Sequence, residues 1–321
     1  MNTAIHSIAS YLPTKVITNA HLEQSCGIDN LFLEKKIGIQ ERRVAAEEET
    51  TSVMATWAAK RLLSLNGKSA SDIDLLIVCT QNPDYRLPTT ACLVQSNLGC
   101  KTSCAAFDIN LGCSGYVYAL AIADSFIKAG YSRHALLIMA EQYSRLIDPK
   151  DKNTVSLFGD AAAASWVSSC RDDAGIIDVD LNTDGLGATH LIAYNSGVKR
   201  DAEKPESLCM NGREIFRFAI TMAPESVHRV LKRNKLTVAD IKSFVFHQAN
   251  QYILSELQKL LGIREDQMII DMALTGNTVS ASIPLILETQ WRNRTFESGD
   301  RLILCGFGVG LSWGSILYVM P

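Results

Sequence analysis

NGKSASDIDLLIVCT (residues 66–80) and NKLTVADIKSFVFHQ (residues 234–248) read as two copies of one element. Each copy runs from an asparagine through a polar turn to an Asp-Ile pair and then into an apolar run. An apolar run that is continuous rather than alternating is typical of a strand whose sheet is covered by helices on both faces. The repeat therefore predicts a duplicated α/β unit.

The segments that follow each copy extend the repeat. Residues 105–130 (AAFDINLGCSGYVYALAIADSFIKAG) and 268–293 (MIIDMALTGNTVSASIPLILETQWRN) each predict a second strand that ends in small residues and opens a helix. Third strands are predicted at 134–141 (HALLIMAE) and 300–308 (DRLILCGFG). Three elements thus recur in the same order in the two halves of the chain.

The order of these elements predicts the architecture. The helix at 114–129 carries only two charged residues, so we expect it to be buried nearly all round. Two halves, 1–170 and 171–321, would pack their sheets around such central helices in five layers, α-β-α-β-α. Residues 213–235 predict an amphipathic helix that Pro224 kinks or restarts.

Composition narrows the class of function. The chain has 321 residues, 47% of them hydrophobic, and a net charge of −3, so we expect neither a nucleic-acid partner nor attraction to a membrane. It has no signal-peptide pattern and no apolar run of about 18 residues, so we expect a cytoplasmic protein. Nine scattered cysteines predict no disulfide framework. Cys100 and Cys104 lack the second ligand pair of a zinc site, so we expect no metal.

Cys113 is a candidate nucleophile. It follows the strand FDIN and a Leu-Gly corner, and the pattern predicts that it begins a helix. Backbone N–H groups and the helix dipole at such a position would stabilise a thiolate and lower the pKa of the thiol. A thiolate there would accept an acyl group. The alternative is a cysteine packed inertly at a strand–helix junction.

His247 and Asn277 are candidate partners of the cysteine. His247 ends the strand FVFHQAN, at the sheet edge where functional groups of α/β proteins gather, and it takes the place of Cys79 in the repeat. Asn277 lies in TGNTVSASIP, where small residues allow a substrate to approach the backbone. A core histidine bonded to a carbonyl and a helix-capping asparagine are the alternatives.

A glycine-rich segment, CGFGVGLSWGS (residues 305–315), follows a buried strand near the end of the chain. No βαβ unit follows it, so nucleotide binding is a poor interpretation. A turn that aims backbone N–H groups at an oxyanion fits the pattern better.

Taken together, these segments resemble the β-ketoacyl-[acyl-carrier-protein] synthase III family, whose members have a thiolase-like fold. The resemblance covers essentially the whole chain. Its motifs are SYLPTKVITNAHLE near the start, GIQER (38–42), FDINLGCSGYVYAL, LFGDAAAA (157–164), FHQANQYI (246–253), GNTVSASIP (276–284) and GFGVGLSWGS (306–315). Several separate motifs in one order are more specific than any single motif.

The resemblance implies a triad of Cys113, His247 and Asn277. Cys113 would be acylated by an acyl thioester, usually acyl-CoA, before malonyl-acyl-carrier protein binds. His247 and Asn277 would donate to the malonyl thioester carbonyl as decarboxylation forms an enolate, which attacks the acyl group in a ping-pong sequence. The oxyanion of that attack would meet the backbone N–H of Cys113 and one from the final turn, at Val309. Phe307 would shield the pocket.

The resemblance also implies the product and the assembly. A 3-oxoacyl-acyl-carrier protein would start fatty-acid or specialised-metabolite (polyketide-like) synthesis. We expect a homodimer with no permanently bound cofactor, and with acyl-CoA and malonyl-acyl-carrier protein as substrates. Replacement of His247 or Asn277 by Ala is expected to abolish malonyl decarboxylation and to leave acylation of Cys113 largely intact.

Several positions depart from the family pattern. Val309 stands between two glycines where the family has three glycines, and its β-branched side chain restricts the backbone. Phe32, Lys36 and Lys152 replace the Trp and two Arg expected at the CoA mouth, and Lys does not stack on a base as Arg does. Leu87 replaces a Phe that closes the acyl pocket, which favours a longer or branched starter, and it would reach across the dimer.

Further positions are assigned to the substrate and to a protein partner. The resemblance places Asn250 and Arg213 at the substrate site. An acidic carrier protein needs a local basic patch on an acidic enzyme. Basic residues on or near the 213–235 helix would supply it: Arg217, Lys232, Arg233 and Lys259. A solvated helix face is the alternative, and Tyr252 stands where the family has a docking Arg.

Two other functions stay open at this point. One is acyl transfer to an oxygen or nitrogen acceptor without decarboxylation, which an acidic residue in place of Asn277 would have favoured. The other is a catalytically silent partner subunit, which would typically lack the nucleophile that Cys113 supplies. The starter acyl group, its donor and the pathway are also left open.

Overall fold

The structure is a computed structural model that describes residues 2–171 and 173–321. The strands are β1 (Asn2–Tyr11), β2 (Lys15–Thr18), β3 (Glu41–Val44), β4 (Leu75–Cys79), β5 (Ala105–Ile109), β6 (His134–Glu141), β7 (Ala161–Cys170), β8 (Gly175–Thr183), β9 (Leu191–Ile192), β10 (Cys209–Met210), β11 (Ser243–Phe246), β12 (Arg301–Gly308) and β13 (Ser312–Val319). The α-helices are α1 (Asn19–Cys26), α2 (Asn30–Phe32), α3 (Thr51–Leu65), α4 (Thr90–Leu98), α5 (Gly115–Lys128), α6 (Lys152–Val155), α7 (Gly212–Arg233), α8 (Gln251–Leu261) and α9 (Ser282–Arg292). Short 3₁₀ turns are η2 (Ala70–Asp72), η3 (Tyr143–Arg145), η4 (Gly185–His190), η5 (Val238–Asp240), η6 (Glu265–Gln267) and η7 (Val279–Ala281), and η1 (Leu33–Ile37) is π-helical.

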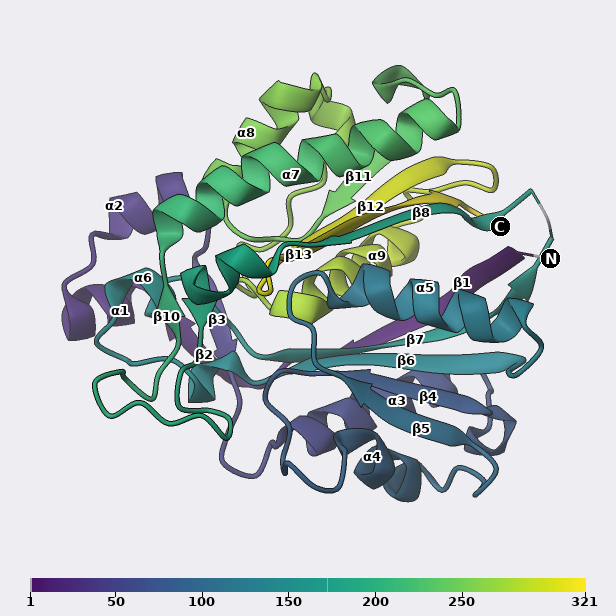
Figure 1. The fold of residues 1–321 in the computed structure, drawn as a ribbon, viewed down its shortest axis with the longest axis horizontal. Helices are drawn as coiled ribbons and strands as arrows, with labels where there is room; N and C mark the ends of the chain where they lie inside the picture. The colour runs from purple at the N-terminus through teal and green to yellow at the C-terminus, as the bar shows by residue number, and fades with distance from the viewer. Residues whose placement is uncertain (1, 172) are drawn as a thin grey trace.

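Five layers are stacked across the molecule (Figure 1). Helices α7 and α8 cover the outer face of one sheet, whose strand order is β11-β12-β13-β8. Helices α3 and α4 cover the outer face of the other, whose order is β1-β7-β6-β4-β5. Helices α5 and α9 lie between the two sheets. This arrangement confirms the predicted α-β-α-β-α architecture.

The two sheets repeat one topology. In the first, β4 runs parallel to β5 and β6, and antiparallel pairing continues from β6 to β7 and β1. In the second, β11 runs parallel to β12, and antiparallel pairing continues from β12 to β13 and β8. The strands predicted at 134–141 and 300–308 are β6 and β12. The division of the chain at residue 170 remains a prediction.

The strand predicted to begin at Met268 is wrong. Met268 forms only a single bridge, with Phe244 of β11, so the second sheet lacks a counterpart of β5. The side chain of Gln248 replaces the missing pairing. Its Nε2 donates to the carbonyl of Ile269 at 3.3 Å, and its Oε1 accepts from the N–H of Asp271 at 2.9 Å. A side-chain amide thus satisfies backbone groups that a strand partner would otherwise take.

The middle layer forms a core that both sheets share. Half of the residues of helix α5 are buried and only Ser125 and Lys128 are exposed on it, so its burial is less complete than predicted. Tyr116 of α5 packs in one apolar cluster with Leu75 of the first sheet and Leu302 of the second. Burial of apolar surface is the main stabilising contribution to such a core. The two halves are therefore held together by the same apolar contacts that fold each of them.

Helix α7 is one unbroken helix of 22 residues. Of the kink or restart predicted at Pro224, the restart is wrong, because the helix continues through this residue, and the kink stays a prediction. Proline removes one helical hydrogen bond. Pro224 is buried on the face that packs against β12 and β13, and this packing outweighs the lost bond. No helix among the described residues is both long enough and apolar enough to cross a membrane.

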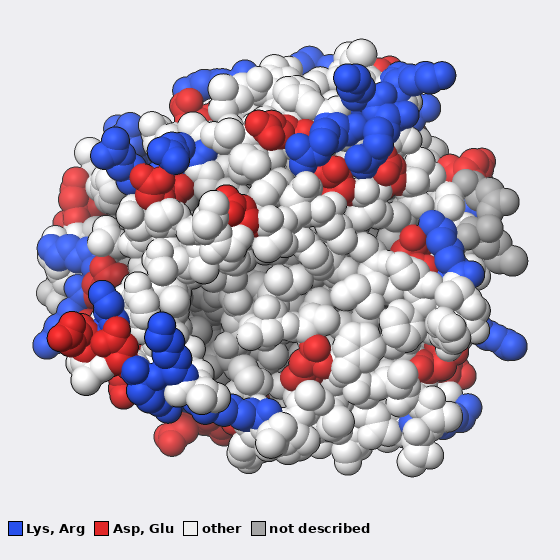
Figure 2. Space-filling model, in the orientation of Figure 1, with Lys and Arg blue, Asp and Glu red and all other residues white. Residues whose placement is uncertain are grey.

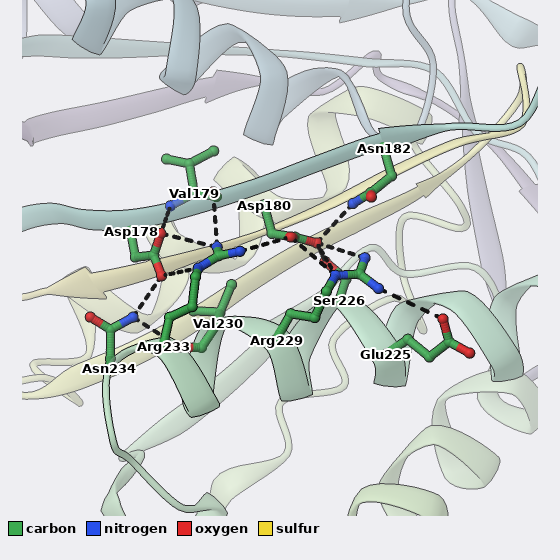
Figure 3. A network of polar contacts seen from close by, with 10 residues as sticks. All are labelled: Asp178, Val179, Asp180, Asn182, Glu225, Ser226, Arg229, Val230, Arg233 and Asn234. Atoms are coloured by element: carbon green, nitrogen blue, oxygen red, sulfur yellow. Dashed lines mark hydrogen bonds and ion pairs between the residues drawn. The ribbon is translucent and has the colours of Figure 1, made fainter.

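A polar network fastens α7 to β8 (Figure 3). Asp180 of β8 accepts a hydrogen bond from Ser226 at 2.8 Å and forms ion pairs with Arg229 at 2.8 Å and Arg233 at 3.1 Å. Arg233 also pairs with Asp178 at 2.9 Å. Burial alone would raise the pKa of Asp180, but these partners lower it to about 2. The basic end of α7 is therefore tied to its own sheet.

Candidate active site

The three residues of the predicted triad line one cavity. Cys113, His247 and Asn277 face a space of about 80 Å³, which Phe307 and Gly308 of β12 also line. Cys113 lies in the turn between β5 and α5, and His247 directly follows β11. Because the carboxyl ends of parallel strands gather functional groups at one edge, the two halves deliver these side chains to the same place.

Strand β12 passes very close to Cys113. A Cβ atom on Gly308 would lie 2.8 Å from the Cβ of Cys113 and 3.1 Å from its Sγ. A Cβ atom on Gly306 would lie 2.8 Å from the carbonyl oxygen of Cys113. Only glycine permits an approach this close. The glycine-rich segment therefore makes room for the nucleophile.

The electrostatic environment of Cys113 differs from the prediction. Helix α5 begins at Gly115, so Cys113 precedes the helix by two residues. Burial raises the pKa of the thiol, the Glu141 carboxylate raises it further, and the N–H of Cys113 offsets only part of this effect. The predicted lowering of the pKa is wrong, because burial disfavours the thiolate more than nearby backbone dipoles favour it.

His247 is a buried, neutral imidazole. The backbone N–H of His247 donates to the carbonyl of Cys305 at 2.8 Å, which extends the pairing of β11 with β12 by one residue. Its Nδ1 lies 2.8 Å from the Oγ of Ser282, and its ring packs edge-on against Phe307 with centroids 5.6 Å apart. Burial lowers the pKa of His247 to about 3. Because Nδ1 is engaged with Ser282, Nε2 is the ring atom left for a ligand in the cavity.

Asn277 is fixed through its backbone and its side chain. Its N–H donates to the carbonyl of Leu157 at 2.9 Å, and its carbonyl accepts from the N–H of Gly159 at 3.0 Å. Its Oδ1 accepts from the N–H of Val279 at 2.9 Å, and its Nδ2 donates to the carbonyl of Ala249 at 3.4 Å. Val279 is held at φ 55°, which a β-branched residue adopts only under constraint. Asn277 thus caps a turn and still has a second amide hydrogen for the cavity.

The N–H groups of Cys113 and Val309 are the predicted oxyanion donors. Across residues 2–171 and 173–321, neither the N–H of Cys113 nor that of Val309 donates to another residue. Val309 follows β12 directly and packs against the apolar cluster that contains Cys113. Its φ lies outside the left-handed region, so its β-branched side chain causes no backbone strain there. The role of Val309 stays a prediction.

A buried carboxyl group beside the triad was missed by sequence reasoning. Glu141, the last residue of β6, is fully buried. Its Oε1 accepts from the hydroxyl of Ser280 at 2.7 Å, and its Oε2 accepts from the N–H of Gln81 at 3.2 Å. Burial raises the pKa of Glu141 to about 8. The available signal was an acidic residue that ends an otherwise apolar strand.

The cavity reaches the surface beside the start of α7. It is lined there by the exposed Gly212 and by Asn250. Asn250 also lines an outer recess with Phe32, Lys36 and Tyr252. The Nζ of Lys36 lies 5.8 Å from the ring centroid of Tyr252. The structure thus brings three predicted substrate residues together: Phe32, Lys36 and Asn250.

The remaining predicted substrate residues are more scattered. Phe307 lines the cavity, and Arg213 is exposed next to Gly212 at the opening. Lys152, on α6, donates from Nζ to the carbonyl of Gly27 at 3.2 Å and lines neither space. Leu87 is 86% exposed and does not line the cavity of this chain.

The four predicted docking residues differ in their surroundings, and their role stays a prediction. Arg233 belongs to the network with β8, and Arg217 and Lys259 pair with acidic neighbours on their own helices at 3.6 and 2.7 Å. Lys232 lies 20 residues along α7 from Gly212, or about 30 Å. In Figure 2, Lys and Arg crowd over the end of α7 that is farthest from this opening. Arg217 therefore lies nearer to the opening than Lys232 and Arg233 do.

Comparisons with known proteins agree with this geometry. Residues 107–185 match the domain family described as 3-Oxoacyl-[acyl-carrier-protein (ACP)] synthase III, and residues 231–320 match its C-terminal family. A relative from Ehrlichia canis (strain Jake), named Beta-ketoacyl-[acyl-carrier-protein] synthase III, is 42% identical over 314 residues, which cover 98% of each chain. A solved 3-oxoacyl-(acyl-carrier-protein) synthase III has a TM-score of 0.94 and 39% identity, and 100% of each chain is covered. The priming β-ketosynthase of the R1128 polyketide pathway has a TM-score of 0.92 and 31% identity, over 100% of this chain and 96% of that one.

Proposed function

We propose a reaction for this chain from the premise that it belongs to the 3-oxoacyl-[acyl-carrier-protein] synthase III family, which confirms the resemblance seen in its sequence. It is an acyl-transferring condensing enzyme. It joins an acyl group to malonyl-acyl-carrier protein with loss of CO₂ and forms a 3-oxoacyl-acyl-carrier protein. The observation that carries this proposal is that Cys113, His247 and Asn277 line a single cavity with an opening to the surface.

The first stage is acyl transfer to Cys113. The Sγ atom attacks the carbonyl carbon of an acyl thioester, and the N–H groups of Cys113 and Val309 receive the oxyanion. When the intermediate collapses, the carbon–sulfur bond to the donor breaks and the thiol proton leaves with the donor sulfur. Because burial raises the pKa of Cys113, the proton stays on the thiol until the attack and ends on the donor sulfur, which leaves as a thiol.

The second stage is decarboxylation and condensation. As CO₂ leaves the malonyl group, the electron pair of the broken bond forms an enolate whose oxygen accepts from Nδ2 of Asn277 and Nε2 of His247. This role places the ring proton on Nε2. Nδ1 then accepts from the hydroxyl of Ser282 2.8 Å away, once that hydroxyl turns from the carbonyl of Val279, to which it donates at 2.9 Å. The enolate carbon then attacks the acyl-Cys113 carbonyl. Cys113 departs as a thiolate and takes up a proton.

The outer recess is the proposed entrance for the acyl donor. Phe32, Lys36 and Asn250 would contact acyl-CoA or another acyl thioester there, and Lys152 would meet its far end. No cofactor is required at any step of this cycle. Among the relatives, the R1128 ketosynthase primes a polyketide, so a specialised pathway is proposed beside fatty-acid synthesis. Acylation with a panel of acyl-CoAs and acyl-carrier proteins identifies the starter.

Two protein contacts complete the proposal. The first is a homodimer, in which Leu87, which does not line the cavity of its own chain, would close the acyl pocket of the partner subunit. The second is an acidic carrier protein, which would dock at the opening beside Arg213 and Arg217. Lys232 and Arg233 lie too far along α7 to guide the same carrier into this opening.

Intact-protein mass spectrometry tests the proposed roles. Incubation with acyl-CoAs should add one acyl mass to the wild type and none to Cys113→Ala. His247→Ala and Asn277→Ala should gain the acyl mass but release no CO₂ from malonyl-carrier protein. His228→Ala, which removes an exposed histidine on α7, serves as the control and should behave as the wild type.

Three outcomes would contradict the proposal. If no acyl thioester adds mass to Cys113, the chain is not an acyl-enzyme catalyst. If CO₂ release survives the loss of both His247 and Asn277, their roles are wrong. If the acyl group passes to a hydroxyl or amine without CO₂ release, the chain performs acyl transfer rather than condensation.

A further inference from the structure

Arg42, in β3, is a buried cation without an acidic partner. Its side chain is 1% exposed, and it forms no ion pair with any residue in 2–171 or 173–321. Its Nε and Nη2 donate to the carbonyl of Ser156 at 3.0 and 2.5 Å, and its Nη1 donates to Oδ1 of Asn19 at 2.5 Å. Burial lowers the pKa of Arg42 to about 10, so it remains charged at neutral pH. An unpaired buried charge is costly, and none of the described residues forms an ion pair with Arg42 to offset that cost.

Ser156, whose carbonyl accepts from Arg42, is the first residue of a short segment that we call the strap (residues 156–159), and the strap hydrogen-bonds to Asn277. The carbonyl of Leu157 accepts from the N–H of Asn277 at 2.9 Å, and the N–H of Gly159 donates to the carbonyl of Asn277 at 3.0 Å. Both backbone polar groups of this catalytic residue therefore depend on the strap. The position of the strap depends in turn on the guanidinium beneath it.

The strand that carries Arg42 also holds the other side of the same loop. The N–H groups of Gln40 and Glu41 both donate to the carbonyl of Ala273, at 2.8 and 3.0 Å. Gly276 lies directly on Arg42, since a Cβ atom there would be 3.1 Å from the Cγ of Arg42. The loop before Asn277 is thus enclosed between β3 and the strap, and Arg42 contacts both.

We propose that Arg42 is a positioning residue for the decarboxylation step, because it sets the place of the strap and thereby aims the Asn277 amide at the enolate oxygen. This proposal rests on the condensing function proposed above. A guanidinium suits the task because its planar fork donates to two separate acceptors, and charge-assisted hydrogen bonds are stronger than neutral ones. Acylation of Cys113 does not use the Asn277 amide, so it should not depend on Arg42.

Arg42→Met and Arg42→Lys test the proposal on the full-length protein. The matched control is Arg43→Met, since Arg43 is the next residue of β3, is only partly buried and makes one long bond of 3.5 Å to a carbonyl. Arg42→Met should lower CO₂ release from malonyl-carrier protein about 10- to 100-fold, the effect of a displaced catalytic group, with Cys113 acylation unchanged. Arg42→Lys should fall between Arg42→Met and the wild type, and Arg43→Met should match the wild type in both assays.

Hydrogen exchange gives a readout that needs no reaction. The N–H of Asn277 should exchange faster in Arg42→Met than in the wild type, while amides of α5 keep their rates. Equal losses of acylation and CO₂ release, or unchanged CO₂ release, would overturn the role of Arg42. If the wild type itself releases no CO₂, the condensing function fails, and the exchange result alone decides whether Arg42 orders Asn277. If Arg42→Met does not fold, Arg42→Lys, which keeps the charge and one donor group, carries the same comparison.

Discussion

Glu141→Gln isolates the electrostatic effect of the buried carboxyl group behind the active site. In the folded protein, burial raises the pKa of Glu141 from 4.5 to about 8. At about 1.4 kcal/mol per pKa unit, ionisation of this group costs the folded state about 5 kcal/mol relative to the unfolded chain. Because the folded pKa is the higher one, the stabilising contribution of Glu141 is complete below pH 4.5, falls as the pH rises toward 8, and stays lost above that pH.

The glutamine variant cannot ionise, so it escapes this loss. Its free energy of unfolding, relative to the wild type, should increase by about 1.4 kcal/mol per pH unit, or about 2.7 kcal/mol from pH 5.5 to pH 7.5. A constant term opposes the gain. The hydroxyl of Ser280 can still donate to the new amide oxygen, but the N–H of Gln81 loses its acceptor, at about 1 kcal/mol.

Urea unfolding followed by tryptophan fluorescence at pH 5.5, 6.5 and 7.5 measures this change. Protein concentration must be held fixed, since assembly would make the apparent stability depend on it. Glu265→Gln, at an exposed position, is the control. Alkylation of Cys113 at pH 8.5 should also be faster in Glu141→Gln, because the Glu141 carboxylate raises the pKa of this thiol. Parallel stability curves for the two glutamine variants would refute the reasoning.

Two other predictions follow from the packing. Gly308→Ala would place a methyl group 2.8 Å from the Cβ of Cys113, so alkylation of the thiol by iodoacetamide should fall at least about 10-fold. The control Gly185→Ala, which has open space around it, should leave labelling unchanged. Equal labelling of both variants would contradict the close approach of β12 to Cys113. Arg233→Gln should lower the free energy of unfolding by about 1 kcal/mol, because it loses half-exposed ion pairs, and should leave the KM for malonyl-carrier protein unchanged. Arg213→Glu should raise that KM without loss of stability. The reverse pattern would place the docking surface at the far end of α7.

Most of the fold could be predicted because its central strands are decided locally. The apolar runs that became β4, β6 and β12 are continuous, and only a strand covered on both faces combines that pattern with such short length. The predicted strand at Met268 failed for a non-local reason. The backbone there pairs with the side chain of Gln248, a partner that periodicity cannot reveal. The restart predicted at Pro224 is wrong for a similar reason, because packing against the second sheet stabilises α7 through this residue.

The candidate site divides in the same way. The identities of Cys113, His247 and Asn277 could be found because each lies at a strand end or a glycine-rich junction, which are local features. The raised pKa of Cys113 could not be predicted from the sequence, because it depends on how closely β12 and Glu141 surround the sulfur. The ion pairs of Arg233 could not be predicted either, because its partners Asp178 and Asp180 lie on β8, far away in the sequence.

The two duplicated halves differ at one pair of equivalent strand ends. Cys79 ends β4 at the position that His247 takes after β11, so each half offers an equivalent strand end. In the first half, α5 leaves no space beside this strand end, since a Cβ atom on Gly115 would collide with Sγ of Cys79. The same sulfur donates to the carbonyl of Leu111 at 2.9 Å. Burial raises the pKa of Cys79 far above its usual range, and Cys79 does not line the cavity. The two strand ends therefore differ, because the close approach of α5 closes the space around Cys79, whereas His247 faces the cavity.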